Sequence, residues 1–325
     1  MDVDALVRGV LAGDRRAVAR AISAVEDGAD DLEALSEGIF PSTGRAATIG
    51  LTGAPGVGKS TLAAGLVRVG RARHLRAAVL AVDPTSPYTG GALLGDRVRM
   101  QEHATDPSVF IRSMATRGHL GGMALAAPEA VRILDAAGYD RVVVETVGVG
   151  QAEVDVAAAT DTAVVVLAPG MGDAVQMAKA GILEVADVFV VNKADREGAP
   201  EVVRELRQML HLGAARDWDP PVLTASAIGS DASDGIDEVW EAIESHRAHL
   251  EASGALGSKR RARLLREVEA LAAARFHIEI ARALDADPAL ADDLVERRTD
   301  PYGAAAMLVR RATGQSPRGG PRRDG

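Results

Sequence analysis

The segment Gly53-Ala-Pro-Gly-Val-Gly-Lys-Ser60 matches the pattern G-x-x-x-x-G-K-[ST], and this match constrains the fold more than any other feature of the chain. The apolar run Ala47–Thr52 precedes the motif, and the helical stretch Thr61–Val69 follows it. In a strand–loop–helix context, glycines let consecutive backbone N–H groups turn around phosphate oxygens, and the helix N-terminus adds partial positive charge. The residues predicted to cradle phosphates are Gly53, Ala54, Pro55, Gly56, Val57, Gly58, Lys59, Ser60 and Thr61.

A second motif, Asn192-Lys-Ala-Asp195, follows the apolar run Val188–Val191 and matches N-K-x-D. A carboxylate at Asp195 can accept hydrogen bonds from N1–H and the 2-amino group of guanine, whereas adenine would leave it partly unpaired, which is costly. Lys193 can lay its stem along the base, and Asn192 can contact the base or tie neighbouring loops together. Further contacts to the base are expected from Ser226, Ala227 and Ile228. Together the motifs predict an enzyme that prefers GTP to ATP and hydrolyses it to GDP and phosphate.

The phosphate motif also implies a Mg²⁺ ion, because the Ser60 hydroxyl is placed to bind one while Lys59 reaches the β- and γ-phosphates. Mg²⁺ favours octahedral oxygen coordination, so further carboxylate ligands are expected. Three candidates follow strands or a glycine-rich turn, namely Asp83, Asp96 and Glu145. Glu145 is favoured because an acid directly after an apolar strand is costly without a cation. A helix cap or a turn is the alternative role for each of them.

The residues after Glu145 are candidates for sensing the γ-phosphate. Gly148 would present a backbone N–H near it, so the residues predicted to act in catalysis are Lys59, Asp83, Glu145 and Gly148. Gln151 either orients the attacking water, as Gln does in some GTPases, or is an ordinary surface residue. No arginine of the chain is evident as a charge-stabilising finger, although Arg97 or a partner's arginine could supply one. We therefore expect slow intrinsic turnover.

Short β-branched runs alternate with helical stretches between Ala47 and Ser226. Several of these runs are continuously apolar, as strands buried on both faces are. Strands that alternate with helices build a parallel sheet with helices on both sides. The sequence therefore predicts an α/β fold with a doubly wound, mostly parallel sheet of about seven strands: Ala47–Thr52, Ala77–Val82, Val109–Arg112, Arg141–Glu145, Thr162–Leu167, Val188–Asn192 and Val222–Ser226.

Helical patterns flank this region on both sides. Asp14 is expected to cap an N-terminal helix, Asp287 is expected to cap a helix over Pro288–Arg297, and a long helix is expected over Ser258–Leu284. The predicted organisation is an N-terminal helical segment over residues 1–44, a nucleotide-binding domain over 45–250 and a C-terminal helical extension over 251–313. The Gly-, Pro- and Arg-rich tail over 314–325 is expected to be disordered.

Composition excludes several classes of protein. The net charge of −9 argues against nucleic acid as the main partner. The absence of cysteine excludes disulfides, thiolate metal sites and cysteine nucleophiles. No apolar run approaches the length that spans a bilayer, and the acidic start is unlike a signal peptide. We expect a cytoplasmic protein with no membrane partner.

Beyond the two motifs, the sequence resembles the MeaB/ArgK family of P-loop GTPases. The resemblance extends over most of the nucleotide domain and rests on Gly53–Thr61, Val82–Pro87, Thr89–Arg97, Arg112–Gly122, Val144–Gln151, Gly170–Gly181 and Val191–Asp195. It implies a P-loop fold of the SIMIBI class, a homodimer, and an adenosylcobalamin-dependent acyl-CoA mutase as partner, such as methylmalonyl-CoA mutase. It also implies that GTP hydrolysis gates cofactor loading and protects the mutase from inactivation.

The resemblance further implies roles for particular residues. Asp83 and Asp96 match acids near Mg²⁺ in the family, and Glu145 matches the acid at the end of the Walker B strand. The segment Gly170–Gly181 resembles a loop that couples nucleotide to the mutase. Within that loop, the candidate contacts are Asp173, Gln176 and Lys179.

Two other functions stay open at this point. GTP-dependent nickel insertion usually needs a His-rich or Cys-rich element. Here His246 and His249, three residues apart on a predicted helix, are a possible ligand pair, but a solvated helix face is the favoured interpretation. An accessory ATPase or kinase of amino-acid transport is disfavoured by the N-K-x-D motif. The basic stretch Lys259–Arg266 is interpreted as a solvated helix face or part of a dimerisation arm, since it lacks the interleaved aromatic residues of a nucleic-acid site.

Overall fold

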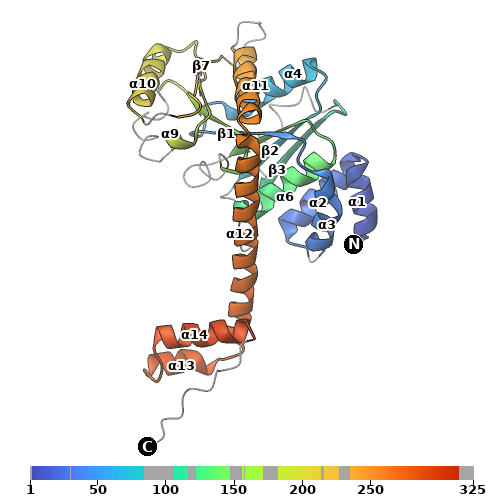
Figure 1. Ribbon diagram of the computed structural model, residues 1–325, viewed down its shortest axis with the longest axis vertical. Helices are drawn as coiled ribbons and strands as arrows, with labels where there is room; N and C mark the ends of the chain where they lie inside the picture. Colours follow the sequence, from blue (N-terminus) through green and yellow to red (C-terminus); the bar gives the residue numbers. More distant parts are fainter. Residues whose placement is uncertain are drawn as a thin grey trace, which may run out of the picture. The chain divides into compact units, whose positions relative to one another are not determined.

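The computed structural model describes residues 2–29, 31–83, 105–115, 122–146, 156, 158–170, 182–213, 216–226 and 235–314. The chain divides into two compact units, Met1–Leu264 and Leu265–Gly325. The first unit contains a seven-stranded sheet with helices on both faces, and it carries both sequence motifs (Figure 1).

The sheet confirms the predicted fold class. Its strand order is β3-β2-β4-β1-β5-β6-β7, and every strand pair is parallel. The strands begin at the predicted residues, whereas β2, β3 and β4 run further than predicted and β6 and β7 end earlier. Their bounds are Ala47–Thr52 (β1), Ala77–Asp83 (β2), Val109–Ala115 (β3), Arg141–Thr146 (β4), Thr162–Leu167 (β5), Val188–Val191 (β6) and Val222–Thr224 (β7).

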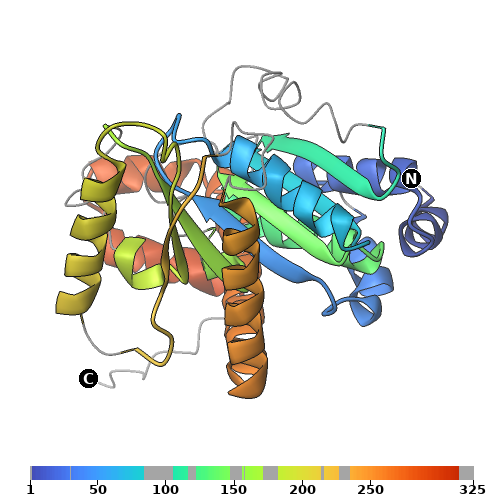
Figure 2. The same ribbon diagram turned by 90° about the horizontal axis from the view of Figure 1, so that it is seen from above.

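One face of the sheet is covered by α4 (Lys59–Ala72) and α11 (Ile236–Ala252), as Figure 2 shows. Successive side chains of a strand point to opposite faces. In β5, Val164 and Val166 therefore pack with α4 and α11, while Val165 and Leu167 pack on the other side with α10 (Ala199–Leu212). The short helix α9 (Ile182–Val185) precedes β6 on that same side. This two-sided burial explains the continuous apolar runs.

The remainder of the second face carries α6 (Gly122–Ala136) and the N-terminal helices. These are α1 (Val3–Leu11), α2 (Arg15–Asp27), α3 (Leu32–Ile39) and the 3₁₀ turn Phe40–Ser42 (η1). The Asp14 carboxylate accepts hydrogen bonds from the backbone N–H groups of Arg16 and Ala17, so the predicted cap of α2 is confirmed. Buried side chains of α1 and α2 belong to one core with Leu80 of β2, and the N-terminal helices are thus part of the first unit.

The C-terminal helices are α12 (Ala255–Asp285), α13 (Ala289–Val295) and α14 (Pro301–Ala312). The predicted cap at Asp287 is wrong: α13 begins after Pro288 without a side-chain cap. The carboxylate of Asp287 instead accepts a hydrogen bond from Arg311 of α14 at 2.5 Å, because a charged guanidinium is the stronger partner. Of the helices that the structure describes, none has the length and apolar character needed to cross a membrane.

Candidate nucleotide site

The phosphate loop connects the end of β1 to the start of α4. Gly53 and Gly58 both have positive φ, at 137° and 102°. A Cβ at Gly53 would lie 2.1 Å from the carbonyl oxygen of Val166 in β5, and a Cβ at Gly58 would lie 2.2 Å from Nδ2 of Asn192. Glycine is therefore required at both positions by the backbone conformation and also by the lack of space.

Lys59 lies inside this loop. Its side chain is buried, and Nζ donates to the carbonyl oxygens of Gly53 at 2.5 Å and Ala54 at 3.1 Å. An ammonium group has three donors and no acceptor, so it can bind loop carbonyls and anionic oxygens at once. The geometry places a buried positive charge where the sequence predicts the phosphates.

Ser60 and Glu145 come together although they are far apart in the sequence. The Ser60 Oγ donates to Glu145 Oε1 at 2.6 Å, and Glu145 is only 2% exposed. Strand β4 lies beside β1 with Leu51 opposite Glu145, so the last residues of β4 reach the first turn of α4. A hydroxyl and a carboxylate oxygen at this distance are the donor types that Mg²⁺ prefers, and the residues fit such an ion.

The base motif contacts the phosphate loop directly. Asn192 is buried, and its Nδ2 donates to the carbonyl oxygen of Val57 at 2.8 Å. Lys193, with a φ of 56°, donates from Nζ to the carbonyl oxygen of Gly56 at 2.6 Å. Of the two roles that the sequence leaves open for Asn192, the structure shows the one that ties neighbouring loops together.

Asp195 stands at the rim of the site with an exposed carboxylate. The Ser226 Oγ donates to Asp195 Oδ1 at 2.9 Å. Ser226 follows β7, which pairs with β6, and the base motif follows β6. The hydroxyl restrains the orientation of the carboxylate that is predicted to read guanine.

Several predicted site residues cannot be compared with the structure. Asp83 is the last residue of β2, at the same end of the sheet as the phosphate loop, but its side chain is not described. The other predicted residues that lie outside the described ranges are Asp96, Arg97, Gly148, Gln151, Asp173, Gln176, Lys179, Ala227 and Ile228. Their roles stay predictions.

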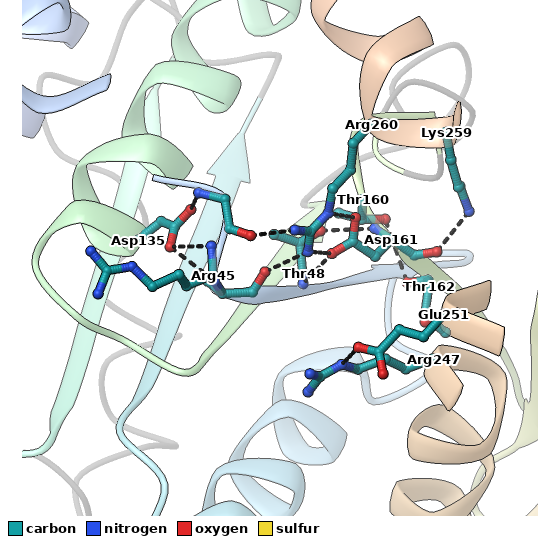
Figure 3. Close-up of polar contacts among 12 residues, drawn as sticks. Arg45, Thr48, Asp135, Thr160, Asp161, Thr162, Arg247, Glu251, Lys259 and Arg260 are labelled. Carbon is teal, nitrogen blue, oxygen red and sulfur yellow. Dashed lines mark hydrogen bonds and ion pairs between the residues drawn. The ribbon is translucent and has the colours of Figure 1, made fainter. Parts of the chain in front are cut away.

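The basic stretch at the start of α12 is not wholly a solvated face. Arg261 is exposed, but Lys259 and Arg260 bind groups at the end of the sheet opposite the phosphate loop (Figure 3), and Arg263 binds the carbonyl oxygen of Ala159 at the same end. The buried carboxylate of Asp161 is their main partner. An acid directly before a continuously apolar strand was the signal that could have identified this partner.

His246 is also not on a solvated face. It is 1% exposed, its Nδ1 lies 2.9 Å from Thr162 Oγ1, and its Nε2 lies 3.3 Å from Asp187 Oδ1. Burial lowers the pKa of His246, although the charge of Asp187 opposes this effect. Within the described ranges, no group of three or more His, Cys, Asp or Glu side chains is arranged to hold a metal ion.

Comparison with known proteins places this site in a family. Residues 18–284 match the family model described as methylmalonyl-CoA mutase-associated GTPase MeaB. A Pyrococcus horikoshii protein that bears the name of a GTPase is 46% identical over 317 residues, which cover 96% of this chain and 99% of that protein. The GTPase ArgK of Escherichia coli is 40% identical over 259 residues, 77% of each chain.

A solved structure agrees with these sequence matches. The crystal structure described as an LAO/AO transport system kinase superposes with a TM-score of 0.69 at 27% identity and covers 94% of this chain and 96% of its own. The phosphate loop, the Ser60–Glu145 pair and the base motif lie together at one end of the sheet. The chain belongs to the family of MeaB-type, methylmalonyl-CoA mutase-associated GTPases.

Proposed function

We propose that this GTPase is a chaperone of an adenosylcobalamin-dependent acyl-CoA mutase, either methylmalonyl-CoA mutase or a close relative. Hydrolysis of GTP would gate loading of the cobalamin cofactor and protect the mutase from inactivation. The observation that carries the proposal is the match of residues 18–284 to a family described by its association with methylmalonyl-CoA mutase. The proposal places the protein in the cytoplasm, together with GTP and acyl-CoA.

In this proposal the nucleotide site works by positioning and charge. Lys59 neutralises the phosphates, the base motif selects guanine through Asp195, and Ser60 and Glu145 hold Mg²⁺, with Asp83 and Asp96 as further ligands. When bound, Mg²⁺ supplies positive charge that offsets the negative charge developing on the phosphates. Because Asn192 and Lys193 bind the phosphate loop, recognition of the base and alignment of the phosphates are mechanically linked.

The protein would act as a homodimer through α12. Large apolar side chains are exposed along this helix, including Leu265 at 55%, Val268 at 62% and Leu271 at 43%. Exposed apolar residues that recur along one helix mark an interaction surface. A second copy of the same helix is the occupant that the family resemblance implies.

Initial rates of phosphate release with and without a purified adenosylcobalamin-dependent methylmalonyl-CoA mutase test the chaperone proposal. We expect the mutase to accelerate hydrolysis, and we expect transfer of adenosylcobalamin to the mutase to depend on GTP. Lys59→Ala is the matched control, since it removes the phosphate-binding charge and should abolish both effects. A rate that the mutase leaves unchanged would refute the partnership but not the GTPase activity.

No described feature favours nickel insertion, and a separate binding measurement distinguishes that function from the proposed mutase chaperone. A nickel-delivery protein should bind Ni²⁺ in equilibrium dialysis with an affinity that changes between GDP and a non-hydrolysable GTP analogue. We expect no such nucleotide-dependent binding.

A further inference from the structure

A buried carboxylate joins the first turns of α12 to the start of β5. Asp161 is 2% exposed and accepts hydrogen bonds from Arg260 Nε at 3.1 Å and Nη2 at 2.6 Å, as well as from the backbone N–H of Thr48 at 3.1 Å (Figure 3). Burial opposes ionisation of Asp161, but the hydrogen bond from Arg260 and the charge of Arg263 outweigh it, and the pKa is lowered. The ionised carboxylate makes the first turns of α12, up to Leu264, an integral part of the first unit.

The same turns of α12 also hold the backbone that leads into β5. Arg263 Nη1 donates to the carbonyl oxygen of Ala159 at 2.9 Å, and Lys259 Nζ donates to that of Asp161 at 2.7 Å. Arg260 Nη2 donates to the carbonyl oxygen of Ala46, just before β1, at 2.8 Å. Helix α12 thus holds the entrances to two adjacent strands, β1 and β5.

On its other side, the segment before β5 packs directly on β1. A Cβ at Gly50 would lie 2.6 Å from Thr160 Oγ1 and 2.9 Å from a methyl carbon of Val156, so no space separates the segment from the strand. The Thr160 hydroxyl donates to the carbonyl oxygen of Val156 at 3.0 Å, which fixes the segment internally. Val156, Ala159 and Thr160 therefore link Gly50 of β1 to Arg263 of α12.

One neighbour of this segment, β1, leads directly to the nucleotide site. Strand β1 continues from Gly50 through Thr52 into the phosphate loop. A displacement of residues 158–160 must therefore strain β1, break the Arg263–Ala159 hydrogen bond or move the first turns of α12. The first turns of α12 are expected to follow the segment, because Asp161 directly adjoins it and separating this buried carboxylate from Arg260 and Arg263 is costly.

We propose that Arg263 is a positioning residue for GTP hydrolysis, and that through it the phosphate site and the first turns of α12 depend on each other. Coupling between binding sites is reciprocal in free energy: if exchange of GDP for GTP changes the equilibrium of α12, then a ligand that restrains α12 changes the preference for GTP over GDP by the same factor, whereas the effect on kcat is a separate consequence of positioning. The inference needs GTP hydrolysis only, and it stands or falls independently of the mutase partnership.

Steady-state kinetics of Arg263→Ala test the proposal. We expect kcat for GTP to fall by about 2- to 30-fold, the range typical of residues that couple sites, with KM and the Kd for GDP unchanged. Arg263→Lys keeps a donor for Ala159 and should restore part of kcat. Arg261→Ala is the matched control, because Arg261 is the exposed arginine of the same turn and should leave kcat unaltered.

A second control separates positioning from loss of stability. Glu244→Gln weakens the ion pair of Arg141 and Glu244, which is 2.9 Å long and lies at the same end of the sheet, where Arg141 begins β4. If Glu244→Gln lowers Tm as Arg263→Ala does but keeps kcat, the positioning role is supported. An equal fall of kcat in both variants, or an unchanged kcat in Arg263→Ala despite a lowered Tm, would overturn it.

The reciprocal half of the proposal has its own measurement. Hydrogen–deuterium exchange of residues 255–264 should differ between the GDP-bound protein and the protein bound to a non-hydrolysable GTP analogue. In Arg263→Ala this difference should disappear while both nucleotides still bind. Exchange that is independent of the nucleotide in the unaltered protein would show that α12 is a passive anchor.

Discussion

Gly58 shows how closely the phosphate and base loops pack at the scale of single residues. Its positive φ disfavours any other residue, and a Cβ there would also displace the Asn192 side chain that binds Val57. Gly44 offers a comparison, since its φ of 96° is similar but nothing lies within 4 Å of an added Cβ. Replacing glycine at these two positions therefore distinguishes the free-energy cost of the backbone conformation alone, at Gly44, from the added cost of a steric clash, at Gly58.

We therefore expect Gly44→Ala to lower the free energy of unfolding by about 1–2 kcal/mol, the cost of a left-handed backbone conformation. Gly58→Ala should cost more and should also weaken GTP binding, because it breaks the contact between the loops. Urea unfolding and nucleotide titration of both variants measure this. Equal losses in the two variants would mean that the contact with Asn192 is unimportant.

Asp195 is the residue at which base specificity can be inverted. Asp195→Asn replaces a carboxylate acceptor by an amide, so preference should move from guanosine toward xanthosine triphosphate. Ser226→Ala serves as control: it removes the hydroxyl that orients Asp195 at 2.9 Å and should weaken binding modestly without changing the preferred base. Competition between the two triphosphates is the measurement, and an unaltered preference in Asp195→Asn would mean that the base is read elsewhere.

At the scale of secondary-structure elements, the first turns of α12 work as an anchor. Their basic residues satisfy Asp161 and the backbone carbonyls that precede β1 and β5. The first unit ends at Leu264, inside α12, beyond the anchor residues. We propose that the folding unit of the GTPase includes these turns.

Truncation tests the extent of this folding unit. A chain ending at Leu264 should keep cooperative unfolding, whereas one ending at Gly257 leaves Asp161 as a buried charge without its arginine partners. The shorter chain should be less stable by about 3–5 kcal/mol, the usual cost of removing one side of a buried ion pair. Thermal unfolding of the two truncated chains is the measurement. Equal stability would mean that the folding unit of the GTPase ends before the first turns of α12.

The Asp161 anchor also predicts a pH dependence. Since the pKa of Asp161 is lowered from its ordinary 3.8 in the folded protein, its stabilisation is present above that pH and is lost as pH falls through the folded pKa. Asp161→Asn should therefore destabilise the protein at pH 7 by about 3 kcal/mol, with the difference shrinking below about pH 4. Urea unfolding between pH 3 and pH 8 tests this, and a difference independent of pH would exclude the ionised anchor.

At the scale of the whole molecule, the two units share one helix, since α12 begins in the first and continues in the second. The exposed apolar side chains of α12 lie from Leu264 onward, past the anchor. The helix therefore has two different surfaces along its length, one satisfied within the chain and one suited to a second copy.

The proposed dimer is expected to depend on the second surface. Leu265→Glu together with Val268→Glu places charges where apolar contacts are needed and should give a monomer in light scattering coupled to size exclusion. Arg261→Glu changes charge on the same helix and should leave the dimer intact. A dimer that survives the double substitution would place the interface elsewhere.

The local features of this protein followed from sequence alone. The phosphate loop, the base motif and all seven strand starts depend on residues close together in the chain, where the pattern of apolar residues and glycines reflects the local backbone directly. The two motifs gave the expectation of a GTPase, which the comparisons confirm. The cap of α2 at Asp14 was predictable for the same reason, while that of α13 failed because a distant arginine competes for Asp287.

Contacts between distant residues were decided only by tertiary structure. The order of strands brings Glu145 to Ser60 and Asn192 to Val57, and the path of α12 brings Arg260 to Asp161. A periodic pattern indicates which face of an element is buried, but not which element covers that face or which charged side chain lies against it. The phosphate motif therefore determined the chemistry of the site, whereas its connection to α12 emerged only when the folded sheet placed β1 and β5 side by side.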